Sequence, residues 1–478
     1  MKKKAICLLL AGAMAVSGLA GCSNSSDGEK GSGESAEKLV IWGGVPGEDG
    51  PNEIISAWNE AHPETPAEYV RFVNDDTGNT KLDTALQSGE QIDVFFTYSA
   101  DLLNKRASSG MLEDLGNYDA DSFVEENILG GKDSFPQIDG KIYGVPTVTE
   151  PTGIMINKDM LDEKGITIPE DWTISDYEEI ARQLTGEKDG KTVYGCTVYW
   201  GGSPLPIPKS ILGGDEFYKS ATESNFDAPE YRINTRFKEM MDEGIAMPYE
   251  EIFSRKLEVY AHPAFLSGEI AMMPFSAWML RYVNDEENFP HDFITTFAPF
   301  PSTDDGTPNP YQSENNNMIC MNSQSKNKET AWEFMKFWIT DGYQYVAKMP
   351  AYADADEEQI VSKILGENSE ERFDVEAYKK VMLRDDFKYI VPTITTAYSE
   401  ITQIYKEECQ NYFLGVTSEE EYYSNLKTRA DEAIQSAQYF LKLQAQNGPA
   451  AFLLKEIKIE DGKKKKKIKS GSISFYRP

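Results

Sequence analysis

Short apolar runs alternate with amphipathic segments through the first half of this 478-residue chain. Residues 38–43 have the pattern of a buried strand ending in glycines, and residues 52–61 repeat apolar side chains at helical spacing. The alternation recurs through 82–98 and 143–199, whereas the chain beyond residue 329 is mostly helical. Such alternation is typical of mostly parallel sheets flanked by helices. The sequence predicts an α/β fold of two such lobes with a helical C-terminal region, since a body of roughly 400 residues exceeds one ordinary domain.

The N-terminus has the layout of a secretory signal. Three lysines precede an apolar run at residues 5–16. That run is too short to cross a bilayer, which takes about 20 apolar residues. Leu19-Ala20-Gly21-Cys22 resembles the bacterial lipobox, which implies cleavage before Cys22 and lipid on its sulfur. We therefore expect a signal peptide at 1–21, a flexible tether rich in Ser, Gly and Glu at 22–37, and attachment to the outer face of the cell membrane. The alternative is an ordinary signal peptide with an incidental cysteine.

Charge and cysteine content exclude several classes of protein. Loss of residues 1–21 would remove three lysines and leave 44 basic against 79 acidic residues, a net charge of −35. This acidity argues against binding to nucleic acid. Three cysteines of the body, Cys196, Cys320 and Cys409, are too far apart in sequence for a disulfide framework, so we expect buried free thiols. Residues 447–478 are basic, which predicts either a disordered tail or a membrane-surface segment.

Catalytic motifs are scarce in this sequence. It has no phosphate loop, no dinucleotide-binding glycine fingerprint and no nucleophile elbow. The three histidines, His62, His262 and His291, are not at metal-ligand spacing. We expect no cofactor, no metal and no catalysis. A glycoside hydrolase needs only two suitably spaced carboxylates, and the many acids leave that function open.

Several elements occur in the order of a known family across residues 38–443. They are Leu86-Gln87-Ser88-Gly89 with Ile92-Asp93-Val94-Phe95, Gly110-Met111-Leu112-Glu113-Asp114-Leu115, Asp139 to Pro146 with Ile156 to Leu161, Gly213-Gly214, Asn225 to Glu230, Phe265 to Met273 with Trp278, and Ser325 to Phe334. The sequence thereby resembles the family 1 extracellular solute-binding proteins, the group of maltose-binding protein. It departs from the family at Ile92, where proline is usual.

The resemblance implies a monomeric binding protein of the type II periplasmic kind, which passes a carbohydrate to the permease of an ABC importer. Three crossovers are expected, near 147–152, 272–276 and 318–324. They would divide the chain into lobe 1, formed by 38–146 and 273–320, and lobe 2, formed by 147–272 and 321–446. The solute would bind between the lobes and close the hinge.

A sugar site combines rings, on which the flat C–H faces pack, with charged or amide groups that bind hydroxyls. In open α/β sheets such residues gather at strand ends. By resemblance, Trp278 is the ring that stacks on sugar and Glu150 lies in the first crossover. The polar run at 314–317 precedes the last one. The candidate ligand-binding residues are Trp42, Glu48, Tyr98, Ser99, Glu150, Tyr199, Trp200, Trp278, Tyr311 and Glu314. Each aromatic candidate has packing in a core as its competing interpretation.

Two other functions compete with solute binding. One is a lipid-anchored glycoside hydrolase or lyase, which would turn over a chromogenic glycoside. The other is a surface adhesin, which predicts no deep cleft and no thermal shift with small solutes. A solute other than a sugar also remains open.

Overall fold

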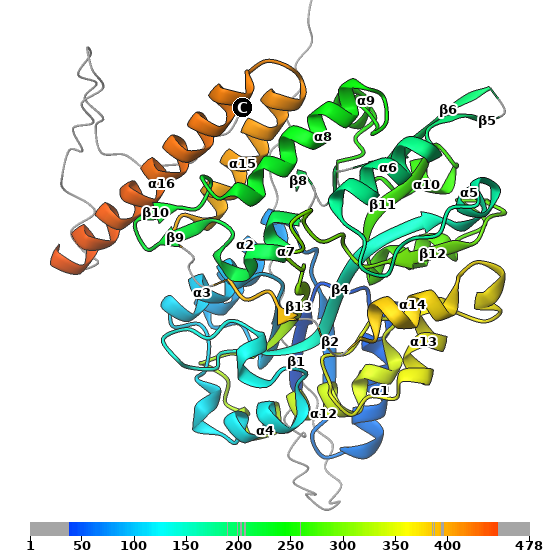
Figure 1. The fold of residues 1–478 in the computed structure, drawn as a ribbon. Coiled ribbons are helices and arrows are strands. Elements are labelled where there is room, and N and C mark those ends of the chain that lie inside the picture. The colour runs from blue at the N-terminus through cyan, green and yellow to red at the C-terminus, as the bar shows by residue number, and fades with distance from the viewer. Residues whose placement is uncertain are drawn as a thin grey trace, which may run out of the picture.

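The computed structural model describes residues 38–447 apart from 189, 198, 201–202, 205–206, 259, 385, 387 and 393–395. The predicted signal peptide, Cys22, the tether and the tail beyond Asn447 lie outside the described residues. Ten strands form one curled sheet in the order β2-β1-β3-β13-β4-β11-β6-β5, with β12 on β4 and β14 on β13. Helices flank this sheet, and β4 runs from one lobe into the other (Figure 1). No described helix is long and apolar enough to cross a bilayer.

The first lobe is built on three parallel strands and the helices that cover them. Its elements are β1 (Leu39–Gly43), α1 (Pro51–Ala61), β2 (Ala67–Arg71), α2 (Asp76–Ser88), β3 (Val94–Thr97), α3 (Ala100–Ser108), α4 (Ala120–Asn127) and α12 (Lys328–Thr340).

Two long strands, β4 (Val145–Asn157) and β13 (Tyr311–Met321), join this lobe to the second. They pair antiparallel, so the mixed sheet is parallel at β2-β1-β3 and at β11-β6 and antiparallel where the lobes meet.

The second lobe is larger and richer in helices. Its helices are α5 (Lys158–Lys164), α6 (Ile174–Leu184), α7 (Ile207–Leu212), α8 (Ile233–Asp242), α9 (Tyr249–Ser254), α10 (His262–Leu266), α11 (Leu280–Val283), α13 (Glu357–Leu365), α14 (Val375–Met382), α15 (Tyr398–Phe413) and α16 (Glu419–Asn447). Its strands are β5 (Gly186–Lys188), β6 (Lys191–Cys196), β7 (Tyr199–Trp200), β8 (Ser203–Pro204), β9 (Tyr218–Ser220), β10 (Glu223–Ser224), β11 (Ile270–Ser276), β12 (Thr295–Ala298) and β14 (Lys388–Tyr389).

Local sequence signals account for several of these boundaries. Helix α6 begins with a capping box, in which the Thr173 hydroxyl accepts from the Asp176 backbone N–H and the Asp176 carboxylate accepts from the Thr173 backbone N–H. Helix α2 ends at Gly89, whose φ of 76° suits a residue without a Cβ. The three cysteines of the body are buried and free, as predicted.

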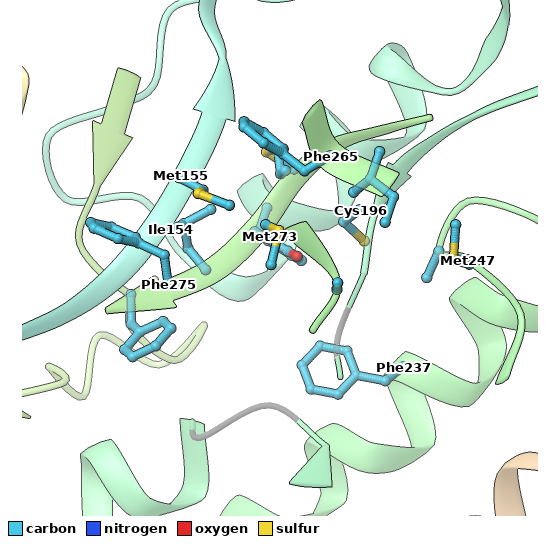
Figure 2. Packing of buried hydrophobic residues seen from close by; sticks show 14 of the residues in the cluster. Ile154, Met155, Cys196, Phe237, Met247, Phe265, Met273 and Phe275 are labelled. Carbon is cyan, nitrogen blue, oxygen red and sulfur yellow. The ribbon is translucent and has the colours of Figure 1, made fainter. Parts of the chain in front are cut away.

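Each lobe has its own apolar core. The first-lobe core draws on residues 39–145 and 318–351, and the second-lobe core on 154–300 and 349–434. Figure 2 shows part of the second core, where Ile154 and Met155 of β4 lie beside Met273 and Phe275 of β11.

These cores divide the chain at points other than those predicted. Strand β11 was expected to leave the second lobe, but it lies between β4 and β6 and all seven of its residues are buried there. Helix α12 was expected in the second lobe, but it buries Trp332, Phe334 and Trp338 in the first-lobe core. The passages between cores are therefore β4, β13 and residues 340–360. The apolar pattern of a segment predicts that it is buried, but it does not show in which of the two cores.

Candidate functional site

A cleft of about 810 Å³ lies where the two lobes meet. The first lobe contributes Glu48, Asp49, Glu53, Arg71, Asn74 and Tyr98, and the second contributes Tyr260, Trp278, Arg281 and Lys363. Glu150 of β4 and Asn316 of β13 also line the cleft, with Tyr345 and Lys348 from the third passage. The cleft therefore combines rings with charged and amide groups and draws them from both lobes.

Tyr98 follows β3 and presents its ring to the first-lobe side of the cleft. Its hydroxyl oxygen accepts a hydrogen bond from the Gly44 backbone N–H at 2.6 Å. A Cβ on Gly44 would lie 3.0 Å from the ring, so the glycine permits this close approach. Burial raises the pKa of Tyr98 to about 12, which keeps the phenol neutral and able to donate its proton.

Trp278 is the corresponding ring on the second lobe. It lies in a 3-10 turn, Ala277–Met279, directly after β11. The rings of Tyr260 and Tyr282 meet it nearly at right angles, with centroids 6.0 and 6.2 Å away. Edge-to-face contacts of this kind favour one ring orientation. Trp278 is half-buried, so part of the indole surface remains free for a ligand.

Glu150 and Glu314 face each other across β4 and β13. Burial raises the pKa of Glu150. Lys348 acts in the opposite direction, and the nearby Glu314 carboxylate adds a smaller increase. Glu314 forms an ion pair with Lys209 of α7. Each glutamate thus has its own lysine, and Glu150 is the one that lines the cleft.

Glu216 of the second lobe is a further carboxyl close to Lys209. Burial raises the pKa of Glu216 to about 7, against the effect of Lys209. Burial alone would lower the pKa of Lys209, but the Glu216 and Glu314 carboxylates raise it well above its ordinary value. The lysine therefore stays charged between two carboxylates and ties α7 to β13.

Four predicted residues, Glu48, Tyr98, Glu150 and Trp278, line the cleft, and Glu314 adjoins it. Tyr199 and Trp200 form β7, but their side chains lie outside the described part of the structure.

Three predicted residues lie elsewhere. Trp42 is 4% exposed in the first-lobe core, because β1 is a central strand with every residue buried. Ser99 caps α3, its hydroxyl accepting from the Leu102 N–H at 3.2 Å. Tyr311 lines a separate cavity of about 620 Å³ together with Thr149. It stands three residues from Glu314, an odd spacing that puts the two on opposite faces of β13.

Sequence reasoning missed all four basic residues of the cleft. Arg71, Arg281, Lys348 and Lys363 come from segments far apart in the chain. Arg281 alone had a local signal, since it follows Trp278 by three residues and one helical turn brings both to one side. Within the described ranges, no three or more His, Cys, Asp or Glu side chains are placed to hold a metal ion.

Residues 46–345 match the family model of bacterial extracellular solute-binding proteins. A lipoprotein from the oleD 5′ region of Streptomyces antibioticus is 29% identical over 181 residues, which is 36% of this chain and 38% of that protein. The galactooligosaccharide-binding protein of Bacillus subtilis is 24% identical over 242 residues, 49% of this chain and 52% of that one. The chain therefore spans about half of these relatives or less.

A solved structure extends the likeness to the whole body. The sugar transporter of Rhizobium etli in an open conformation has a TM-score of 0.67 at 19% identity, covering 84% of this chain and all of that one. This likeness confirms the predicted fold, a two-lobed α/β architecture of the type II periplasmic-binding-protein kind.

Proposed function

This chain belongs to the bacterial extracellular solute-binding protein family, and we propose that it is the lipid-anchored solute-binding subunit of an ABC importer for a sugar or oligosaccharide. The observation that carries the proposal is the composition of the cleft, where the Trp278 ring, held by two tyrosines, lies in the same cavity as Glu150 and Asn316. A ring accepts the apolar face of a sugar, while carboxylate and amide groups bind its hydroxyls. The ligands named for the relatives above support the choice of carbohydrate.

Binding across the cleft supplies the driving force for closure. A ligand that touched one lobe equally in both states would shift no equilibrium. Here Tyr98 of the first lobe and Trp278 of the second line the same cavity, so one ligand reaches both. The closed form would then be the one that a membrane permease recognises.

Attachment through Cys22 is part of the proposal. It is supported by the lipobox-like segment and by the lipoprotein among the relatives. Lipid on Cys22 would hold the body of the protein at the membrane surface next to its permease.

Glycoside hydrolysis is the competing function, because Glu150 and Glu314 form a facing pair of carboxylates. A retaining hydrolase needs one free nucleophile and one proton donor across the scissile bond. Glu314 is held by Lys209, and it does not line the cleft. We therefore propose binding without turnover.

A thermal-shift screen against neutral and acidic oligosaccharides tests this proposal. A ligand at about 100 times its dissociation constant adds about 2.7 kcal/mol to the free energy of unfolding. Each hit is then incubated with the protein and assayed for new reducing ends. A shift without product supports a binding subunit; product formation supports the hydrolase; no shift across the panel contradicts the choice of carbohydrate.

A further inference from the structure

Three of the basic side chains that line the cleft come from the second lobe and from the third passage. Arg281 comes from α11, Lys363 from α13, and Lys348 from the third passage between the lobes. In the part of the chain that the structure describes, none of the three has a carboxylate oxygen within 4.0 Å of its charged nitrogens. Arg281 instead stacks on the Tyr282 ring, 4.9 Å from its centroid, and donates to the Tyr282 hydroxyl at 3.0 Å.

The positive charges of Arg281 and Lys348 are close enough to act on each other. Burial lowers the pKa of Lys348, and the nearby positive charge of Arg281 adds to the decrease, while Glu150 and Asp49 oppose it. Acids outnumber bases 79 to 47 in the sequence, yet acids and bases are equal in the cleft, with four of each. Basic side chains that form no ion pair raise the local concentration of acidic ligands beside them.

We propose that the saccharide bound in this cleft carries an acidic group, and that Arg281, Lys348 and Lys363 bind that group. The inference rests on the proposed function and narrows it to acidic saccharides. A uronate carboxylate, a phosphate ester or a sulfate ester has the required chemistry. The Arg281 guanidinium suits a carboxylate or phosphate through paired N–H donors, and the lysines act as point charges.

The position of Trp278 supports this arrangement. Trp278 and Arg281 are three residues apart in one continuous helical stretch, Ala277–Met279 followed by Leu280–Val283. Residues at this spacing project from the same side of a helix. A sugar ring stacked on Trp278 would therefore carry an acidic substituent toward Arg281.

The first lobe offers a different partner for the same basic residues. Its side of the cleft carries Glu48, Asp49 and Glu53, which could pair with Arg281 and Lys363 when the lobes close. In that case the basic residues would strengthen closure around every ligand, whatever its charge. The two roles predict different dependence on the charge of the ligand.

Titration calorimetry with matched ligands separates these roles. The probes are an oligogalacturonate, its carboxyl-reduced neutral counterpart, and phosphorylated and sulfated oligosaccharides of similar length. For the wild type, we expect an acidic probe to bind about tenfold or more tightly than the neutral one, with affinity falling as salt rises. Which acidic probe binds identifies the acidic group.

The double variant Arg281→Gln/Lys363→Gln should lose that preference, the acidic probe weakening about tenfold more than the neutral one. Lys164→Gln/Lys326→Gln is the matched control, since it removes the same charge from exposed positions outside the cleft and should keep the preference. Equal losses for both probes in the Arg281/Lys363 variant would overturn the proposal in favour of closure. Equal wild-type affinity for both probes would overturn it while leaving the proposed function intact. Absence of binding for every saccharide would overturn the proposed function itself.

Discussion

Glu150 and Glu314 are directly opposite each other in the antiparallel register of β4 and β13, the two strands that connect the lobes. Like charges at facing positions repel, and strand pairs ordinarily avoid them. The structure compensates with Lys209 at Glu314 and Lys348 near Glu150. Both glutamates therefore lie on the strands about which the lobes would move.

Replacement of Glu150 by Gln tests its role as a hydroxyl acceptor. Hydrogen bonds to a charged group contribute roughly 1.5–3 kcal/mol, so we expect affinity for the saccharide to fall roughly 10- to 150-fold. Because burial raises the pKa of Glu150, its ionised form is disfavoured in the folded state. The melting temperature at pH 8 should therefore stay constant or increase. Calorimetric titration and a melt on the same variant check both, with Glu163→Gln on the exposed side of α5 as control. Unchanged affinity would exclude Glu150 from the site.

Glu216 should make stability depend on pH. Burial raises the pKa of this carboxyl from its ordinary 4.5 to about 7, so the folded protein binds a proton that the unfolded chain releases. By linkage, this contribution to stability is complete below about pH 4.5 and is lost as pH rises toward 7. Melting curves from pH 4.5 to 8 should show a smaller fall with rising pH for Glu216→Gln than for the wild type. Parallel profiles for the two proteins would contradict the assignment.

Two tryptophan variants distinguish a ring that binds ligand from a ring that packs in the core. Trp278→Ala removes a ring from the cleft, and we expect a loss of about 2–3 kcal/mol of binding free energy, or roughly 30- to 150-fold in affinity. Trp42→Ala is the matched control in the first-lobe core, where truncation should destabilise folding by roughly 3–5 kcal/mol with affinity nearly intact. Denaturant melts and titrations on both variants provide the comparison. A large stability loss with unchanged affinity for Trp278→Ala would place this ring in a purely structural role.

The membrane anchor can be tested through Cys22. If lipid on this sulfur holds the protein, Cys22→Ser should move it from the membrane fraction to the soluble fraction without changing its affinity for solute. Fractionation followed by immunoblotting measures the distribution. Retention of the variant on membranes would point to another attachment, for which the basic segment 447–478 is the first candidate.

The sequence predicted elements well where a local signal defined them. The apolar periodicity beyond residue 329 predicts helices there, and α12 and α15 confirm it. The family resemblance implies Trp278 as a ligand-binding ring, and the structure places it in the cleft.

Long-range relationships were not predictable in the same way. The run that contains Trp42 is apolar throughout, which indicates a strand buried on both faces, whereas the prediction places this tryptophan at the cleft. Lys348 and Lys363 reach the cleft because the third passage and α13 fold back toward α11. No spacing rule connects them with Arg281. Their convergence depends on packing between distant segments, and only the assembled lobes reveal it.

Titration calorimetry of the wild-type protein with the best saccharide from the thermal screen tests the central claim most directly. Binding between the lobes predicts a single saturable transition with one ligand per chain, after which each injection gives only the heat of dilution. A hydrolase would instead release heat continuously while substrate remained, and the ligand would be recovered cleaved. A saturable one-to-one isotherm with intact ligand is the result that we predict. Continuous heat with cleaved ligand, or no binding heat for any saccharide, would contradict the account.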